Sequence, residues 1–148
     1  MAIALVNFKR LLLSLVVFIV GLLSTFDVNA SHAVGIDLSY ICLGGNQYEF
    51  TVSLYRDCDG ISAPTSINVD IGSASCGINS SVSLSQTSMQ EVSQICATSL
   101  PNTTCNGGTL PGIEQYVYSG TFSMPAQCSD WVASYSLCCR NAGITNLT

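Results

Sequence analysis

Two aspartates and a cysteine precede a glycine in the stretch YRDCDGI, and carboxylates at this spacing could bind calcium. A calcium loop of the EF-hand kind needs further oxygen ligands at alternate positions and a closing carboxylate. After Gly60 no acidic residue occurs before Asp70. This favours a turn in which Asp57 and Asp59 accept hydrogen bonds from nearby N–H groups and Gly60 takes a positive φ. Calcium stays open as the alternative, because ligands from other loops leave no trace in the spacing; no cofactor is otherwise expected.

Nucleophilic catalysis needs a base beside the nucleophile, and His32 is the single histidine of the chain. It lies two residues after the expected cleavage site, where a side chain is usually mobile. The cysteines are expected to be oxidised, so they would not act as nucleophiles. We therefore predict that the chain is not an enzyme.

Aromatic side chains near the C-terminal end could stack on a sugar ring. The candidates are Trp131, Tyr116, Tyr118 and Tyr135. Trp131 is in phase with Ala133 and Leu137 on an alternating strand, which favours a place in the core instead. A carbohydrate-binding module that uses exposed aromatics, with or without calcium, is the alternative function.

Eight cysteines follow the apolar N-terminal segment, and an even number in a secreted chain predicts a disulfide framework. They are Cys42, Cys58, Cys76, Cys96, Cys105, Cys128, Cys138 and Cys139. A zinc site is disfavoured, since there is no CxxC pair. Many pairings are possible, and we expect Cys42–Cys139, Cys96–Cys105, Cys58–Cys76 and Cys128–Cys138.

The first thirty residues have the pattern of a helical secretory signal peptide. Lys9 and Arg10 precede an uncharged apolar run over residues 11–23, which is shorter than the roughly 20 residues of a membrane-spanning helix. Val28 and Ala30 provide small residues for cleavage. We expect residues 1–30 to be removed and residues 31–148 to form one extracellular domain, secreted or at the cell surface, without membrane insertion after removal.

The predicted mature domain is acidic. Arg56 and Arg140 are its two fixed positive charges, against eight carboxylates, which gives a net charge of −6. A nucleic-acid-binding protein needs clustered Lys and Arg to displace counterions from phosphates. The composition therefore excludes nucleic acid as a partner and favours other extracellular protein domains or surface glycans.

Alternation of apolar and polar residues predicts strands throughout the domain. The clearest case is QYEFTVSLYRD, in which Tyr48, Phe50, Val52 and Leu54 share one face. A turn over residues 44–46 would join this strand to the one before it as a hairpin. The predicted strands cover residues 35–43, 47–57, 66–72, 80–86, 112–124 and 129–141, and no helix is expected after residue 30. We expect an all-β fold, an antiparallel immunoglobulin-like β-sandwich of about six to eight strands.

Residues 31–66, SHAVGIDLSYICLGGNQYEFTVSLYRDCDGISAPTS, resemble the N-terminal region of large secreted surface proteins of gliding bacteria. The resemblance continues through TCNGGTLPGIEQYVYSGTF, CSDWVASYS and CCRNAGITNL. Proteins of this family are exported by the type IX route and usually carry a gliding-motility-associated C-terminal sorting domain. The resemblance implies a non-catalytic, adhesin-like module built as a β-sandwich, and it supplies no catalytic or ligand residue. Members continue well beyond this point, so the chain is expected to be an N-terminal piece.

Overall fold

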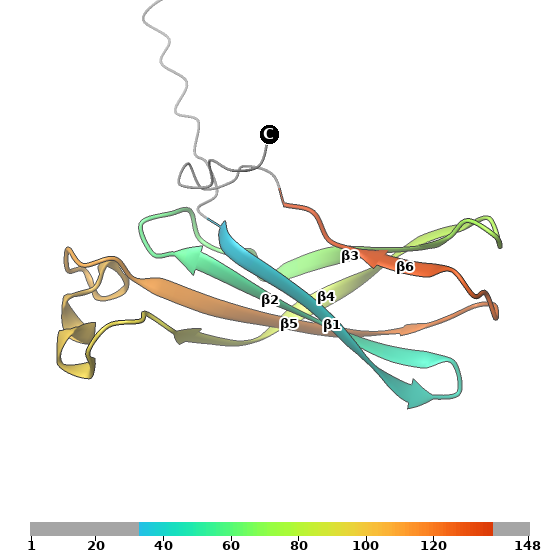
Figure 1. The fold of residues 1–148 in the computed structure, drawn as a ribbon, viewed down its shortest axis with the longest axis horizontal. Coiled ribbons are helices and arrows are strands. Elements are labelled where there is room, and N and C mark those ends of the chain that lie inside the picture. The colour runs from blue at the N-terminus through green and yellow to red at the C-terminus, as the bar shows by residue number, and fades with distance from the viewer. Residues whose placement is uncertain (1–32, 138–148) are drawn as a thin grey trace, which may run out of the picture.

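The computed structural model describes residues 33–137, which form an all-β domain with two short 3-10 helices (Figure 1). The strands are β1 (Ala33–Gly44), β2 (Gln47–Asp57), β3 (Ser66–Ser73), β4 (Ile78–Glu91), β5 (Ile113–Ser123) and β6 (Trp131–Ser134). The 3-10 helices η1 (Ala97–Asn102) and η2 (Thr104–Asn106) lie between β4 and β5. The predicted signal peptide, His32, Cys138 and Cys139 lie outside the described residues.

The six strands form one antiparallel sheet in the order β1-β2-β5-β4-β3-β6. The predicted all-β class and antiparallel pairing are confirmed. The two layers expected of a sandwich are instead halves of one continuous sheet, because β4 pairs with strands of both halves. Its residues as far as Ser85 pair with β3, and its residues from Ser85 to Glu91 pair with β5.

The sheet bends along β4, where the pairing with β5 is irregular between Gln86 and Ser88. An irregularity of this kind increases the local bend and twist of a strand. The halves consequently cross each other in Figure 1 and bury one shared core. The buried apolar residues of this core come from four strands: Phe50, Val52, Leu54, Ile67, Val69, Ile71, Val82, Leu84 and Tyr118.

The predicted hairpin between the first two strands is confirmed. Gly44, Gly45 and Asn46 all have positive φ values of 92°, 59° and 64°, which glycine and asparagine tolerate better than other residues. The alternation in β2 also predicts the burial correctly, since Phe50 and Leu54 face the core.

The last strand is shorter than the sequence predicts, because the pairing of β6 with β3 ends at Ser134. Its predicted inward face is correct: Trp131, Ala133, Tyr135 and Leu137 all pack against the core. Burial raises the pKa of the Tyr135 hydroxyl. No helix within residues 33–137 has the length and apolar character required to cross a bilayer.

Glu91, at the end of β4, holds the long loop that carries η1 and η2, two short 3-10 helices that correct the expectation of no helix after residue 30. Its carboxylate accepts hydrogen bonds from the hydroxyls of Ser93 and Thr103 at 2.7 and 2.8 Å and from the amide of Asn106 at 2.9 Å. These bonds, the one from Ser93 first, lower the pKa of Glu91. One carboxylate thus contributes three bonds to a compact loop without regular strand pairing, which backbone hydrogen bonds and the Cys58–Cys105 disulfide also hold.

Candidate functional site

The Asp57–Gly60 segment forms the predicted turn. The Asp57 carboxylate accepts the backbone N–H of Asp59 at 3.1 Å, and the Asp57 carbonyl accepts the N–H of Gly60 at 3.0 Å. The prediction of a positive φ at Gly60 is wrong, because the positive-φ glycines of the described chain are at other positions. Among residues 33–137, no third acidic, cysteine or histidine side chain joins Asp57 and Asp59 in a metal-binding group.

Arg56 fixes the loop that follows this turn. Its guanidinium donates to the carbonyl oxygens of Gly60 at 2.7 Å and Ile61 at 2.8 Å, and to the Glu114 carboxylate at 2.8 Å. The ion pair is mostly buried, with side-chain exposures of 12% and 14%. The guanidinium carbon also lies 5.8 Å from the centre of the Tyr116 ring, and the Tyr116 hydroxyl donates to Glu114. Burial, then the bond to Glu114, raises the pKa of Tyr116.

One group of potential metal ligands occurs in the described chain, formed by Cys58, Cys105 and Glu114. The two sulfur atoms are joined in a disulfide, and a metal-binding cysteine must be a free thiolate. The group therefore has one usable ligand and does not constitute a metal site.

Two disulfides hold opposite ends of the domain, Cys58–Cys105 and Cys76–Cys128. The predicted pairs Cys58–Cys76, Cys96–Cys105 and Cys128–Cys138 are wrong, because each uses a cysteine that bonds elsewhere. Strand register explains the observed pairs. Asp57 pairs with Ile113, which brings Cys58 to the loop before β5, and Ser73 pairs with Trp131, which brings the β3–β4 turn to the segment before β6.

Cys42 and Cys96 are exposed and have no disulfide partner among residues 33–137. The expected Cys42–Cys139 pair includes a cysteine outside that range. Cys42 lies beside Tyr48. Charge repulsion from the Cys42 sulfur, and then a hydrogen bond with it, raise the pKa of Tyr48.

Of the four aromatic residues predicted as sugar-stacking candidates, Trp131 lines a pocket and Tyr135 packs against the core. Tyr118 has 0% exposure, its hydroxyl donates to the Pro64 carbonyl at 2.8 Å, and burial raises its pKa to about 12. Tyr116 is half-buried beneath Arg56. Trp131 is half-buried and lines a pocket, so it can contact both the core and a ligand.

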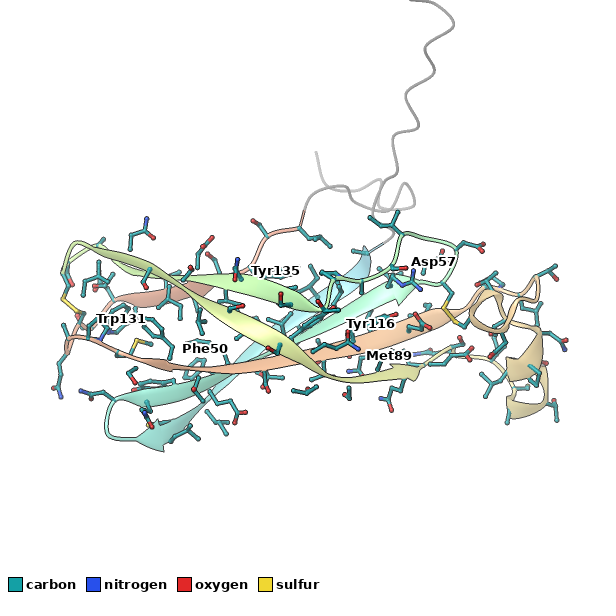
Figure 2. The ribbon with its side chains drawn as sticks, turned by 180° about the vertical axis from the view of Figure 1, so that it is seen from behind. Phe50, Asp57, Met89, Tyr116, Trp131 and Tyr135 are labelled. Atoms are coloured by element: carbon teal, nitrogen blue, oxygen red, sulfur yellow. A yellow bond between two sulfur atoms is a disulfide. The ribbon has the colours of Figure 1, made fainter. Side chains whose placement is uncertain are left out.

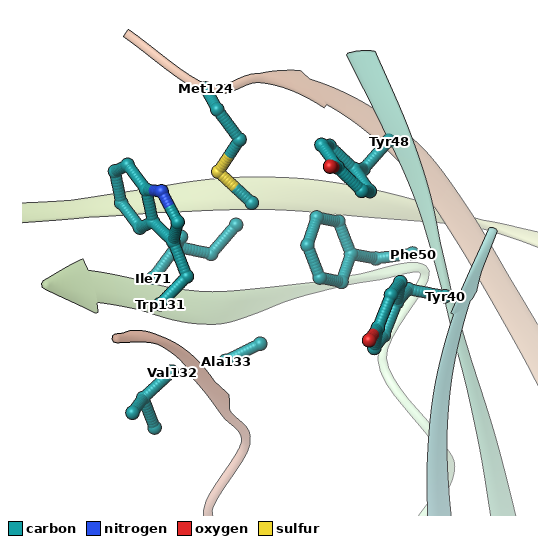
Figure 3. Close-up of a pocket in the computed structure, with 8 residues that line it drawn as sticks. All are labelled: Tyr40, Tyr48, Phe50, Ile71, Met124, Trp131, Val132 and Ala133. Carbon is teal, nitrogen blue, oxygen red and sulfur yellow. The ribbon is translucent and has the colours of Figure 1, made fainter. Parts of the chain in front are cut away.

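We use the name aromatic groove for the pocket lined by Tyr40, Tyr48, Phe50, Ile71, Met124, Trp131, Val132 and Ala133. It encloses about 160 Å³ and lies between β1 and β2 on one side and β3 and β6 on the other (Figure 3). The Tyr40 ring lies 6.1 Å from the rings of both Tyr48 and Phe50, centre to centre. Apolar pockets lined by aromatics are typical ligand sites.

A second hollow of about 290 Å³ shares Tyr48, Met124 and Trp131 with the aromatic groove and adds polar lining. Asn46 and Gln127 supply amide groups there. Aromatic faces beside amide donors and acceptors suit a ligand with both apolar faces and hydroxyl groups. Figure 2 places Trp131 at the opposite end of the domain from Asp57, so the groove is separate from the turn.

Asp130 fastens the end of the domain that carries the groove. Its carboxylate accepts hydrogen bonds from the hydroxyls of Ser73 and Ser75, both at 2.5 Å, and from the Ser75 N–H at 2.8 Å. Together with the Cys76–Cys128 bridge, these bonds attach the β3–β4 turn to the segment that leads into Trp131. The position of the tryptophan is thus fixed by two anchors in the segment that precedes it, Asp130 and Cys128.

These bonds, those from Ser73 and Ser75 first, lower the pKa of Asp130 from 3.8 to about 2. Because the folded state binds the proton more weakly than the unfolded state, this stabilisation is present above about pH 4 and is lost as the pH falls toward 2. The Asp130→Asn variant should therefore lose less stability across this window. Urea unfolding at several pH values measures the free energy of unfolding, with Asp70→Asn, an exposed β3 position, as control. If this free energy fell equally with pH in wild type and Asp130→Asn, the prediction would be contradicted.

The sequence did not single out Tyr40 or Tyr48 as ligand-binding residues. Tyr48 was assigned to the inward face of its strand, which is correct. The signal that could have found the groove is the hairpin register, since Tyr40 pairs with Phe50 and Cys42 pairs with Tyr48. Comparison with protein-family models, with curated proteins and with solved structures finds no match.

Proposed function

We propose that this domain is a non-catalytic extracellular module that is adhesive and binds through the aromatic groove. The observation that carries the proposal is the exposed aromatic surface beside that groove: Tyr40 is 65% exposed although its strand neighbour Phe50 is buried. Large exposed apolar side chains around a pocket mark interaction surfaces. Two disulfides are consistent with an extracellular protein, and the Cys76–Cys128 bridge would keep the binding end rigid.

The absence of catalysis is part of this proposal. The two carboxyl groups with displaced pKa values, Glu91 and Asp130, are both shifted downward by hydrogen bonds. A general acid needs the opposite shift, toward neutral pH. Both groups hold loops in place, which supports a structural role for them.

We further propose that the chain is exported by its N-terminal segment and belongs to the surface proteins of gliding bacteria that use the type IX route. The bent sheet, whose halves enclose one core, supports a place among immunoglobulin-like sandwich modules, which such surface proteins contain. The reading frame beyond Thr148 tests the proposal: repeats and a sorting domain should follow it. An unrelated downstream sequence would contradict it.

The test of the binding function compares two exposed apolar positions far apart on the domain. Beads coated with the protein should attach to immobilised glycans or extracellular proteins, and Tyr40→Ala should reduce attachment about tenfold, as expected when an aromatic anchor is removed. Met89→Ala is the matched control, since Met89 is 52% exposed and lies away from the groove (Figure 2). Equal attachment of both variants would contradict the proposal.

Carbohydrate is the second candidate ligand, because Trp131 and Tyr48 line both hollows beside the amides of Asn46 and Gln127. A glycan array with wild type and Trp131→Phe separates the two ligand classes. Retained glycan binding by wild type and weaker binding by the variant support a sugar ligand. Binding to protein spots alone supports the adhesive function without a sugar ligand.

A further inference from the structure

The inward face of β1 is only partly covered, since Leu38 packs against the core while other apolar side chains of the strand are exposed. Four residues of this face pair with the core-facing residues of β2: Ile36 with Leu54, Leu38 with Val52, Tyr40 with Phe50 and Cys42 with Tyr48. Directly paired residues lie on the same face of a sheet, so these β1 side chains point to the core side. Ile36 is nevertheless 41% exposed, while its partner Leu54 is 3% exposed. The cover over the core thus ends one strand short of the sheet edge.

The opposite half of the sheet explains the gap. It ends at β6, which pairs with β3 over the four residues from Trp131 to Ser134, and among residues 33–137 no strand pairs with the outer edge of β6 or of β1. A β1 strand of twelve residues therefore faces a much shorter strand. The space between them is lined by apolar side chains from both edges.

The free edge of β1 is regular. Its pairing with β2 shows irregularities between Ala33 and Gly35 and between Cys42 and Gly44, and none from Gly35 to Cys42. Proteins usually protect edge strands with lysine, proline or bulges, because unpaired N–H and C=O groups bind other strands. This stretch contains one charged residue, Asp37, and neither lysine nor proline.

Charge selects the kind of strand that fits. Residues 33–137 contain eight acidic side chains and one basic one, a net charge of −7, and that basic residue, Arg56, is paired with Glu114. Two copies of this domain would therefore repel each other. Asp37 lies on the outward face of β1, and Glu49 pairs with Ile41 on the same face. A complementary strand would be basic on that face.

We propose that β1 binds an extended segment of another protein in which apolar residues alternate with lysine or arginine, added as a further strand of the sheet. The apolar side chains pack on Ile36, Leu38 and Tyr40, and the basic ones lie beside Asp37. Main-chain hydrogen bonds supply affinity and alternate side chains supply specificity in this mode of recognition. The inference rests on the proposed adhesive function and names the chemical class of its partner.

The test uses the full mature chain and a blocked ten-residue peptide that alternates valine with lysine. Hydrogen exchange is measured for each backbone amide with and without the peptide. We expect added protection along Gly35–Cys42, because edge N–H groups become hydrogen-bonded. A peptide that alternates valine with glutamate should bind at least about fivefold more weakly, because it meets an acidic surface.

Two variants locate the site without altering the aromatic groove. Ile36→Asp should weaken binding of the lysine peptide about tenfold, since it places a charge on the apolar contact. Asp37→Lys should weaken it about two- to fivefold, the range of an exposed charge pair, and should strengthen binding of the glutamate peptide. Asp70→Lys on β3 is the charge control and should change neither affinity.

Three results would overturn the inference: no added protection at millimolar peptide of the Gly35–Cys42 amides that point away from β2, protection of those same amides before peptide is added, or equal binding of both peptides. The second result would show that the protein's own residues or a second copy already cover the edge. Attachment through the groove is measured separately with Trp131→Phe, because Trp131 lines the groove and does not lie on β1, whereas Tyr40 belongs to both surfaces. A failure at the β1 edge is thus distinguishable from a failure of the adhesive function.

Discussion

Replacing both Cys58 and Cys105 by alanine is expected to lower the free energy of unfolding by about 4 kcal/mol. The bridge joins residues 47 apart in sequence, and the chain-entropy estimate for a loop of that length has this magnitude. Substituting both cysteines avoids leaving a single reactive thiol. Urea unfolding of the oxidised protein and the variant, at equal protein concentration, measures the difference.

Thr65→Ala is a suitable control, because Thr65 is exposed in the loop between β2 and β3 and its change should stay within about 0.5 kcal/mol. A loss below about 1 kcal/mol in the double variant would contradict the entropy argument. It would mean that the hydrogen bond from the Cys58 N–H to the Gly112 carbonyl and the Arg56 contacts already fix this end of the domain.

The β2 segment shows what the sequence could predict. Period-two alternation assigned both the strand and its buried face, and Phe50, Val52 and Leu54 lie in the core as expected. The second half of β4 shows the limit. Its residues from Ser85 to Gln90 are all exposed, so no apolar alternation marks the strand, and the prediction stopped at residue 86. The bend that makes one sheet from two halves lies in this unmarked stretch.

The sequence failed to predict the disulfide pairs and the groove for a related reason. Both depend on which segments meet in space, and that is set by the register of strands far apart in sequence. Cys76 reaches Cys128 because β3 pairs with β6, which no local pattern shows. Tyr48 and Trp131 meet across the groove by the same route. The turn at Asp57, in contrast, depends on neighbours, and its existence and the bond to the Asp57 carboxylate were predicted correctly, whereas the φ of Gly60 was not.

Replacing Gly120 by valine is expected to destabilise the domain by about 3 kcal/mol, at the upper end of the cost of overpacking a core. Gly120 lies on β5 opposite Phe50, on the inward face. A Cβ atom there would lie 2.7 Å from both Leu84 Cδ2 and the Ser83 carbonyl oxygen. Backbone atoms cannot move aside as a flexible side chain can, so the clash falls on the place where β4 crosses onto β5.

Gly120 is therefore the residue that lets the two halves of the sheet approach each other. Ser119→Val is the matched control, because Ser119 points to the outward face, opposite Thr51, and the same side chain there should cost under about 1 kcal/mol. Thermal and urea unfolding of both variants measure the difference. If Gly120→Val were as stable as Ser119→Val, β4 would have to lie farther from β5 than the structure places it, and the shared core would need another explanation.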